Sequence, residues 1–312
     1  MKLRHFLSLA DLSQAELKAL LDRAIALKHM QRQGERYMPF TGRTLAMIFE
    51  KSSTRTRVSF ETGMAQLGGH ALFLSPRDTQ LGRGESIEDT ARVISRMVDM
   101  VMIRTFSHDN LKLFAAASRV PVINGLSDDH HPCQLLADLM TATEHWGTLE
   151  GRRVAYVGDG ANNMAHSWME AAHIFNFSLR IGSPAPYAPS ADMLATGGEY
   201  VTVLHDPVSA VEGADLVVTD VWTSMGQEQE AGQRRAILQD FQVNHTLMAA
   251  AAPGALFMHC LPAHRGEEVS ADIMDGPLSV VWEEAENRLH AQKALMEFLF
   301  GIGPVAALQG AS

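Results

Sequence analysis

The sequence predicts an α/β protein with two doubly wound parallel-sheet domains and an active site in the cleft between them. Three observations predict this fold. Short apolar runs alternate with helical stretches from Thr44 onward, an order typical of parallel sheets with helices on both faces. The alternation stops at Gly147 and then restarts. Polar clusters follow directly after most of the predicted strands, where open parallel sheets bind their ligands.

The first half of the chain is predicted to form a leading helix and four strands. Ser13 and Glu16 have the spacing of a capping box, so the leading helix is expected to start at Ser13. The strands are predicted at 44–49, 70–74, 100–104 and 120–123, with further helices starting near Thr54, Ser86 and Ser107. The helix after Thr54 is expected to end at Gly68-Gly69 and to bury Val58, Met64, Ala65 and Leu67.

A long helix at 132–146 ends the first half, because Pro132 suits a first helical turn and Gly147 ends the pattern. Strands follow at 154–157, 178–181, 200–204, 215–219 and 255–259, with a helix at 162–175. A last helix at 284–300 has an apolar face that must pack on another element. We expect one domain at 1–146, with 284–312 packing back on it, and a second domain at 147–283.

The composition excludes several classes of protein. The 312 residues carry a net charge of -10, which argues against non-specific binding to nucleic acid or to an anionic membrane. Cys133 and Cys260 lie far apart in the sequence, so a disulfide scaffold is not expected and a reducing compartment is. Neither a membrane-length apolar run nor a signal-peptide core is found, which predicts a cytoplasmic protein.

Ser53-Thr54-Arg55-Thr56-Arg57 is the most informative stretch, because it follows a buried strand and opens a helix. The positive end of a helix disfavours arginine, so basic residues there need a reason. Hydroxyl groups, arginines and free backbone N–H groups together suit a small anion such as phosphate. We interpret this pentapeptide as an anion site rather than as a solvated basic turn.

Two further clusters follow predicted strands in the first half. Arg104 ends an apolar strand, and we expect it to bind an anion together with Arg55 and Arg57 rather than to extend into solvent. His131-Pro132-Cys133-Gln134 opens a helix, whose positive end favours a neutral imidazole. A helix-capping His131 without chemical consequence is an equal alternative. The His and Cys spacing here matches no standard zinc site.

The clusters of the second half suggest an amino-acid ligand. Gly158-Asp159-Gly160 is an incomplete dinucleotide fingerprint, and Asn162 or Asn163 is able to bind a ligand carboxylate instead. Asp220 follows a strand and suits a substrate ammonium group, although an N-cap aspartate is the alternative. A polar loop at 223–235 has the character of a lid.

His259-Cys260-Leu261-Pro262 ends another predicted strand. Neighbouring strand residues point to opposite faces, so His259 is not expected to be the base for a nucleophilic Cys260. We interpret Cys260 as a residue that lines the site, and Leu261-Pro262 as a candidate cis peptide bond.

These motifs, in this order, resemble those of the aspartate/ornithine carbamoyltransferase family over nearly the whole chain. The 53–57 stretch is similar to its carbamoyl-phosphate motif, and Arg104 and 131–134 match the next two elements. The Asp220 loop with Ser224-Met225-Gly226 and the 259–262 stretch resemble the ornithine-specific elements. Residues 78–85 are similar to a loop that reaches the neighbouring subunit's site in this family.

The resemblance implies transfer of a carbamoyl group from carbamoyl phosphate to the δ-amine of L-ornithine, giving L-citrulline and phosphate. A tetrahedral intermediate would be stabilised by Arg, His and Thr donors. Neither a metal nor an organic cofactor is implied. A homotrimer, or a multiple of trimers, is implied.

The resemblance also implies a role for each site residue. The catalytic residues would be Arg55, Arg104, His131 and Cys260. Carbamoyl phosphate would be bound by Ser53, Thr54, Arg55, Thr56, Gln80, Arg104, His131, Pro132, Cys133, Gln134, Cys260, Leu261 and Arg288, with Gln80 coming from the adjacent chain. Ornithine would be bound by Asn163, Asp220, Ser224 and Met225.

Two other hypotheses stay open on the residues alone. A nucleotide-dependent oxidoreductase would use Gly158-Asp159-Gly160, but it leaves the 53–57 cluster unexplained. A non-enzymatic protein that binds an anion and an amino acid on the same two domains would explain the arginines. It gives no reason for the ordered set of polar groups at the strand ends.

Overall fold

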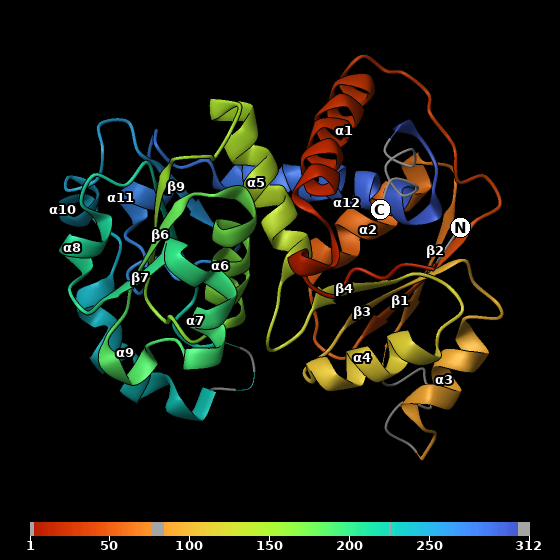
Figure 1. Cartoon of the computed structure of the whole chain (residues 1–312), viewed down its shortest axis with the longest axis horizontal. Coiled ribbons are helices and arrows are strands. Elements are labelled where there is room, and N and C mark those ends of the chain that lie inside the picture. The colour runs from red at the N-terminus through yellow and green to blue at the C-terminus, as the bar shows by residue number, and fades with distance from the viewer. Residues whose placement is uncertain (1–2, 76–83, 225, 227, 305–312) are drawn as a thin grey trace. The chain divides into compact units, whose positions relative to one another are not determined.

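The computed structural model describes residues 3–75, 84–224, 226 and 228–304. Contacts within the chain divide it into two compact units (Figure 1). Unit 1 comprises 1–140 and 286–312, and unit 2 comprises 141–285. The division falls within two helices, α5 (Pro132–Trp146) and α12 (Val281–Phe300).

Strands and helices alternate along both units. The strands are β1 (Thr44–Phe49), β2 (His70–Leu74), β3 (Met100–Arg104), β4 (Val122–Leu126), β5 (Arg153–Val157), β6 (Ser178–Gly182), β7 (Val201–Leu204), β8 (Leu216–Thr219) and β9 (Leu256–His259). The remaining α-helices are α1 (Gln14–Arg32), α2 (Thr54–Gln66), α3 (Ile87–Ile94), α4 (His108–Ala117), α6 (Asn163–Phe175), α7 (Ala191–Gly197), α8 (Pro207–Val211), α9 (Ala231–Leu238), α10 (His245–Met248) and α11 (Ala271–Met274).

Unit 1 contains a four-stranded parallel sheet in the order β2-β1-β3-β4. Helices α3 and α4 cover one face, and α1, α2 and α12 cover the other (Figure 1). Side chains alternate between the faces, so Ala46 and Ile48 of β1 pack with Leu111 and Phe114 of α4. The N-terminal segment extends the sheet, because Phe6 forms a parallel bridge with Ile123.

Unit 2 contains a five-stranded parallel sheet in the order β7-β6-β5-β8-β9. Helices α8, α10 and α11 cover one face, and α6 and α7 cover the other (Figure 1). The first face is filled by apolar side chains that include Val157, Val217 and Phe257. The prediction of two α/β units with parallel sheets is therefore confirmed.

Side-chain caps fix the helix starts where the sequence predicted them. Ser13 forms a capping box with Glu16 ahead of α1, and Ser53, Ser86 and Ser107 each accept a backbone N–H at the start of α2, α3 and α4. Among the described residues, no helix has the length and apolar character that a bilayer span requires.

The predicted apolar face of α2 is wrong in two positions. Val58 and Ala65 are exposed, whereas Ser59, Phe60 and Gly63 are buried with Met64. The cause is α12, which approaches so closely that a Cβ at Gly63 would lie 3.2 Å from Lys293 Cγ. A small residue on the packed face therefore replaces the apolar one that periodicity favours.

Candidate active site

The N-terminus of α2 has the features of an anion site. Ser53 caps the helix, because its Oγ accepts the Thr56 N–H at 3.2 Å. The next two N–H groups, of Thr54 and Arg55, meet no acceptor within the described part of the chain. Unpaired N–H groups at the positive end of a helix bind anions.

Arg57 does not join this group, which corrects the expectation that both arginines bind the anion. Its Nε donates to Glu61 Oε2 at 3.1 Å, and its guanidinium lies over the Phe73 ring at 4.1 Å. Arg57 is exposed, whereas Arg55 is half-buried. The two side chains are about 200° apart around the helix, so they meet different neighbours.

A buried chain of hydrogen bonds links α2, α5 and α12. Arg288 donates through Nη2 to Thr56 Oγ1 at 2.8 Å and through Nη1 to Gln134 Oε1 at 2.9 Å. Gln134 Nε2 then donates to Asp138 Oδ1 at 2.8 Å. These groups are almost inaccessible to solvent, so their mutual contacts orient Thr56 and Gln134. Asp138 was not foreseen, because nothing in its sequence surroundings distinguishes it from an ordinary helix residue.

His131 is buried at the start of α5 among three guanidinium groups. Burial lowers its pKa well below the ordinary value, and the positive charges of Arg288, Arg104 and Arg55 lower that pKa further. His131 is therefore neutral at physiological pH and suited to act as a hydrogen-bond donor without carrying charge. Arg288, Arg104 and Arg55 therefore lie near enough to His131 to lower its pKa.

Cys133 is turned into the interior of unit 1. Its Sγ donates to the Asn124 carbonyl at 3.2 Å, and burial raises the pKa of the thiol to about 12. Such a thiol is a poor nucleophile, so Cys133 anchors the start of α5 to β4. Pro132 is the first residue of α5, as its fixed φ favours.

Lys51 is a further basic group, and in the sequence it lies between β1 and α2. It follows β1, is buried, and forms an ion pair with Asp128. Its Nζ also lies 4.3 Å from the centre of the Phe106 ring. The sequence places Lys51 after a strand, but only the fold reveals that Asp128 neutralises it.

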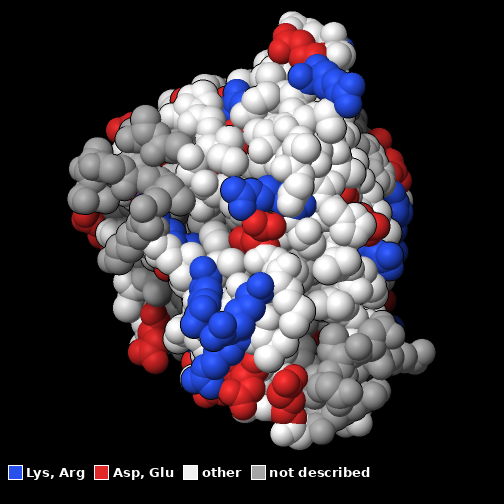
Figure 2. All heavy atoms as spheres, turned by 90° about the vertical axis from the view of Figure 1, so that its right-hand side faces the viewer, with Lys and Arg blue, Asp and Glu red and all other residues white. Residues whose placement is uncertain are grey.

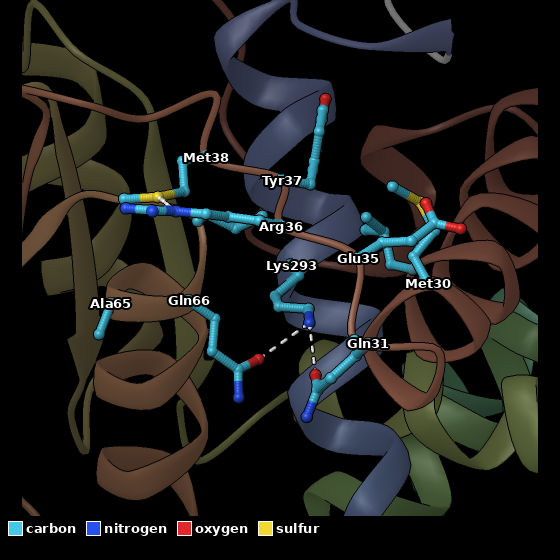
Figure 3. Close-up of a pocket in the computed structure, with 12 residues that line it drawn as sticks. Met30, Gln31, Glu35, Arg36, Tyr37, Met38, Ala65, Gln66 and Lys293 are labelled. Carbon is cyan, nitrogen blue, oxygen red and sulfur yellow. Dashed lines mark hydrogen bonds between the residues drawn. The ribbon is translucent and has the colours of Figure 1, made fainter.

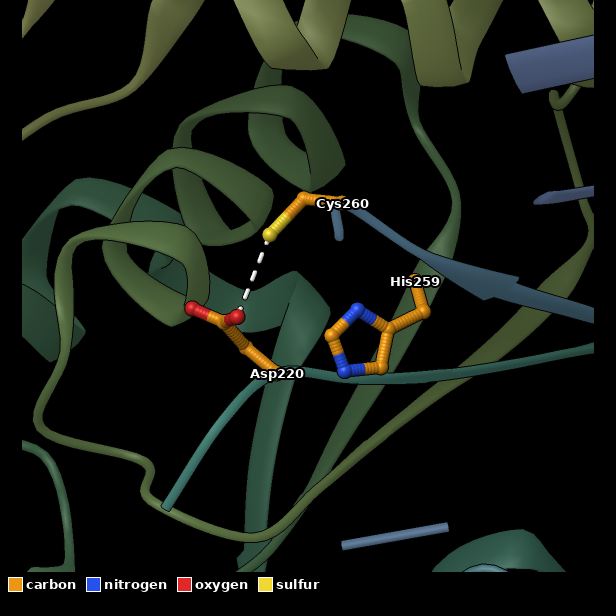
Figure 4. A group of neighbouring side chains, drawn as sticks. All are labelled: Asp220, His259 and Cys260. Carbon is orange, nitrogen blue, oxygen red and sulfur yellow. Dashed lines mark hydrogen bonds between the residues drawn. The ribbon is translucent and has the colours of Figure 1, made fainter. Parts of the chain in front are cut away.

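In unit 2 the strand ends of β8 and β9 bring Asp220 and Cys260 together (Figure 4). Asp220 Oδ1 accepts a hydrogen bond from the Cys260 thiol at 3.1 Å and from the Val221 N–H at 2.7 Å. The described residues 221–224 that follow Asp220 are not helical, so the N-cap alternative does not apply. A buried carboxylate that accepts two donors is suited to hold a cationic group.

His259 holds the segment that follows it and does not pair with the Cys260 thiol. Its Nδ1 accepts the Leu261 N–H at 2.9 Å, and its Nε2 contacts Glu268 Oε1 at 3.1 Å. Nδ1 acts as an acceptor, so the proton of the neutral ring sits on Nε2 and is donated to Glu268. Glu284 accepts the His259 backbone N–H at 3.0 Å. The Leu261–Pro262 peptide bond is cis.

Two clusters of side chains in unit 2 have the composition of a metal site. Asp220, His259 and Cys260 each offer one ligand atom within 4.8 Å of the others, as do His264, Glu267 and Glu268. Both ring nitrogens of His259 are already used, however, and Glu268 Oε1 also accepts the His264 N–H at 2.6 Å. The observed arrangement is a hydrogen-bond network, and a metal ion would have to break it.

The Gly158-Asp159-Gly160 loop is arranged for internal contacts. The Gly160 N–H donates to Ser183 Oγ at 3.2 Å, and the Ala161 N–H donates to Asp159 Oδ1 at 3.0 Å. A dinucleotide pyrophosphate needs such N–H groups free, so this arrangement disfavours the oxidoreductase hypothesis.

Asp159 also anchors the segment expected to form a lid. It is paired with buried Arg234, and burial raises the pKa of Asp159 against the opposing effect of that arginine. Arg234 lies on α9, so the end of the 223–235 segment is helical rather than a polar loop.

Asn162 caps α6, which corrects its proposed role in binding a carboxylate. Its Oδ1 accepts the Ala165 N–H, and its Nδ2 donates to Tyr156 OH, each at 2.8 Å. Asn163 is the first residue of α6 and is half-buried, like Ser224. Gln80 and Met225 lie outside the described residues.

Both units match one family of proteins. Residues 4–144 match the carbamoyl-P binding domain of the aspartate/ornithine carbamoyltransferases, and 150–299 match their Asp/Orn binding domain. The chain therefore belongs to the aspartate/ornithine carbamoyltransferase family.

Within this family the chain is similar to proteins named ornithine carbamoyltransferase. It is 65% identical over 297 residues to that of Halorhodospira halophila, covering 95% of this chain and 99% of the relative. The solved structure from Pyrococcus furiosus is 51% identical with a TM-score of 0.91, covering 96% of this chain and 98% of that one. The structure from Burkholderia thailandensis is 55% identical with a TM-score of 0.89, covering 95% and 98%.

Proposed function

We propose that the chain catalyses the reaction of an ornithine carbamoyltransferase, in which the carbamoyl group of carbamoyl phosphate is transferred to the δ-amine of L-ornithine. The products are L-citrulline and phosphate. Unit 1 binds carbamoyl phosphate and unit 2 binds ornithine. The proposal is supported by family membership and by identities of 61 to 65% to relatives of that name.

One observation in unit 1 carries the carbamoyl-phosphate half of the proposal. The unpaired N–H groups of Thr54 and Arg55 stand at a helix N-terminus, and Arg55, Arg104 and Arg288 surround a neutral His131. Several positive groups gathered around one neutral donor favour a dianion, such as the phosphate of this substrate. A neutral imidazole adds a donor for an oxygen whose charge develops only during the reaction.

The chemistry needs a donor set of this kind. The lone pair of the δ-amine attacks the carbamoyl carbon, and the carbonyl π electrons move onto oxygen as the tetrahedral intermediate forms. Arg104 and His131 stabilise that oxyanion. The C=O bond then re-forms as the C–O bond to phosphate breaks, the bonding pair leaves with phosphate, and the departing phosphate takes up the proton lost by the attacking nitrogen. Preorganised donors of this type are each worth roughly 10² to 10³ in rate.

The remaining contacts are assigned by the family motif. Phosphate is held by Ser53, Thr54, Arg55 and Thr56, and the carbamoyl group is lined by Pro132, Cys133, Gln134, Cys260, Leu261 and Arg288. Gln134 Oε1 and Thr56 Oγ1 are oriented for these roles by Arg288. Gln80 of an adjacent subunit completes this half.

Asp220 carries the ornithine half. Its carboxylate accepts the Cys260 thiol and the Val221 N–H, which fixes its position for the α-ammonium group of the amino acid. Asn163, Ser224 and Met225 complete the contacts to the amino-acid end. A fixed buried carboxylate rejects an analogue that lacks the ammonium group, because the acceptor then remains unpaired.

The protein acts as a cytoplasmic homotrimer, or a multiple of it, in arginine metabolism. Both cysteines are free, which agrees with a reducing compartment. Large apolar side chains are exposed on α2, β2, α3 and the turn after it, namely Val58, Leu72, Phe73, Val93 and Met97. Figure 2 faces the side on which β2 lies in Figure 1, and much of the surface it shows is uncharged. Such a surface favours contact with another subunit.

The test is a comparison of acceptors. Purified protein is incubated with carbamoyl phosphate and with ornithine, N-acetylornithine, aspartate or putrescine, and each carbamoylated product is measured. We expect citrulline from ornithine and little product from the other three. Preference for another amine would retain the carbamoyl-phosphate half and overturn the role of Asp220. Binding of both substrates without product would favour a non-enzymatic binding protein.

A further inference from the structure

A second pocket lies in unit 1, away from the candidate active site. Its volume is about 320 Å³, and it opens between the end of α1, the segment that follows it, the end of α2, and α12 (Figure 3). Gln66, the last residue of α2, lines it, whereas the candidate anion site lies at the first turn of that helix. No step of the proposed reaction uses this pocket. Volumes from about 300 Å³ upward are typical of small-molecule sites.

One of the residues that line this pocket is a buried lysine, Lys293. Lys293 is 3% exposed, and its Nζ donates to Gln31 Oε1 at 2.8 Å and to Gln66 Oε1 at 2.9 Å. An ammonium group has three N–H donors, and the two amides use two of them. The third has no acceptor among the residues that the structure describes.

Within the described part of the chain, no carboxylate is hydrogen-bonded to Lys293. Glu297 is the acidic group that raises its pKa, but both Glu297 oxygens are held by Arg23 at 2.7 and 3.0 Å. Burial outweighs that effect and lowers the pKa of Lys293 to about 8. A buried cation with only amide oxygens beside it is stabilised by any anion that reaches it.

Two amide groups and one guanidinium group add further donors to the lining of the pocket. Gln31 and Gln66 turn their oxygens to Lys293, so their Nε2 groups point away from it and have no acceptor within the described ranges (Figure 3). The Arg36 side chain extends across the pocket, and its Nε contacts Met38 Sδ at 2.9 Å. The rest of the lining is partly apolar and includes Leu27, Met30, Met38 and Leu67. The acidic Glu35 also lines the pocket, and its side chain lies beside Met30 and away from Lys293 (Figure 3).

We propose that this pocket binds a small organic anion, in which a carboxylate is attached to a short apolar body. The carboxylate accepts hydrogen bonds from Lys293 Nζ and from the amide groups of Gln31 and Gln66. The apolar body packs against the leucine and methionine side chains of the lining. Around Lys293 the donors outnumber the acceptors, which selects a carboxylate, and the apolar part of the lining selects an organic anion over an inorganic one.

Thermal-shift titration with hexanoate tests the proposal, with hexanamide and chloride as matched controls. We expect hexanoate to raise the melting temperature in a saturable way. The neutral amide and chloride at equal ionic strength should not do so. Loss of one charge-assisted hydrogen bond should raise the apparent dissociation constant about tenfold or more in Lys293→Met.

A second variant guards against a folding artefact. Gln66→Glu places a carboxylate beside Lys293 within the protein, so it should retain the fold and also raise the dissociation constant about tenfold or more. Lys18→Met, which removes an exposed lysine of α1, should bind as the wild type does. Equal binding of hexanamide, an absence of saturation, or unchanged affinity in both pocket variants would overturn the proposal. Citrulline formation is measured separately, so neither result decides the other.

Discussion

Arg55 and Arg57 stand two positions apart on α2, and the helix turns their side chains toward different neighbours. Arg57 is held by Glu61 and Phe73, while Arg55 contributes to the positive surroundings of His131. The sequence motif is unable to separate the two, because both arginines alternate with hydroxyl residues. What separates them is the position of Phe73 on β2 and of His131 just before α5, which depends on packing between distant parts of the chain.

Replacing these arginines one at a time tests the difference. We expect Arg55→Ala to lower kcat for citrulline formation roughly 10² to 10³-fold, because an oxyanion or phosphate donor is lost. Arg57→Ala removes an exposed ion pair and should change kcat by about twofold or less. Circular dichroism should show both variants folded. Wild-type turnover in folded Arg55→Ala would contradict the assigned role.

His108 should make the stability of the protein sensitive to mild acid. Its pKa is lowered to about 4, chiefly by burial and also by the nearby His130 and Lys112. The unfolded chain binds a proton below about pH 6.5, whereas the folded chain does not until about pH 4. The unfolded state therefore holds more protons between these values, and the free energy of unfolding falls as the pH falls.

The measurement is the urea midpoint at pH 7 and pH 5 for wild type and His108→Gln. The variant keeps a polar side chain beside Ser127, to which His108 Nδ1 lies at 2.9 Å. Between pH 7 and pH 5, we expect the free energy of unfolding to fall by about 1 to 2 kcal/mol less in the variant than in wild type. This figure allows for partial access of solvent to His108. His131 and His290 retain their own acid sensitivity in both proteins. Parallel losses in both proteins would show that His108 does not carry the effect.

At the scale of elements, the segment after β9 is held in place by a buried relay of hydrogen bonds, which runs from Glu268 through His259 to the Leu261 N–H. Glu268 accepts from His259, and His259 accepts the Leu261 N–H, so removal of Glu268 frees the ring to rotate. We expect Glu268→Ala to lower kcat about tenfold or more. Glu268→Gln, which retains an oxygen acceptor, should recover most of that loss.

A structural readout separates this positioning role from general destabilisation. Cys133 is buried, so alkylation of the native protein reports on Cys260. Loss of the relay should speed alkylation of Cys260 in Glu268→Ala and leave the rate in Glu268→Gln close to that of wild type. A lower melting temperature with an unchanged alkylation rate would assign Glu268 a structural role only.

The alternation of strands and helices was predictable from the sequence, but the ends of the individual elements were not always predictable. Each predicted strand has a counterpart, but β4 runs to Leu126 although the apolar run stops at Ile123. Pairing with β3 carries the strand through Asn124, whose Nδ2 is satisfied by the Leu7 carbonyl at 2.8 Å. The short helices of unit 2, α7, α8, α10 and α11, were missed, because four to seven residues give too little periodicity.

At the scale of the whole molecule, local pattern gives the alternation of strands and helices but not the order of the strands. The orders β2-β1-β3-β4 and β7-β6-β5-β8-β9 follow from which helix crosses over which strand. Grouping of polar residues at strand ends was predictable, because all parallel strands end at one edge. The pairs that fix them, such as Arg288 with Gln134, join residues far apart in the sequence and required the fold.

The assembly of the chain has a catalytic consequence if the 78–85 loop supplies Gln80 to a neighbouring subunit. Arg55→Ala and Gln80→Ala should then each have low activity as separate homotrimers, because every site lacks one group. Co-assembly from equal amounts of the two variants changes this. A site is complete when its own subunit keeps Arg55 and its neighbour keeps Gln80.

In closed trimers that assemble at random, about half of the sites keep Arg55 in their own subunit, and about half of these have a neighbour that keeps Gln80. About a quarter of the sites are therefore complete. We expect citrulline formation at about a quarter of the wild-type rate in the mixed trimers, after subtraction of the activity of each parent. The mass of the assembly, measured by analytical ultracentrifugation, should be a multiple of three chains of 34.2 kDa. If each subunit instead supplied both groups to its own site, mixing would restore nothing, because no subunit in the mixture carries both side chains.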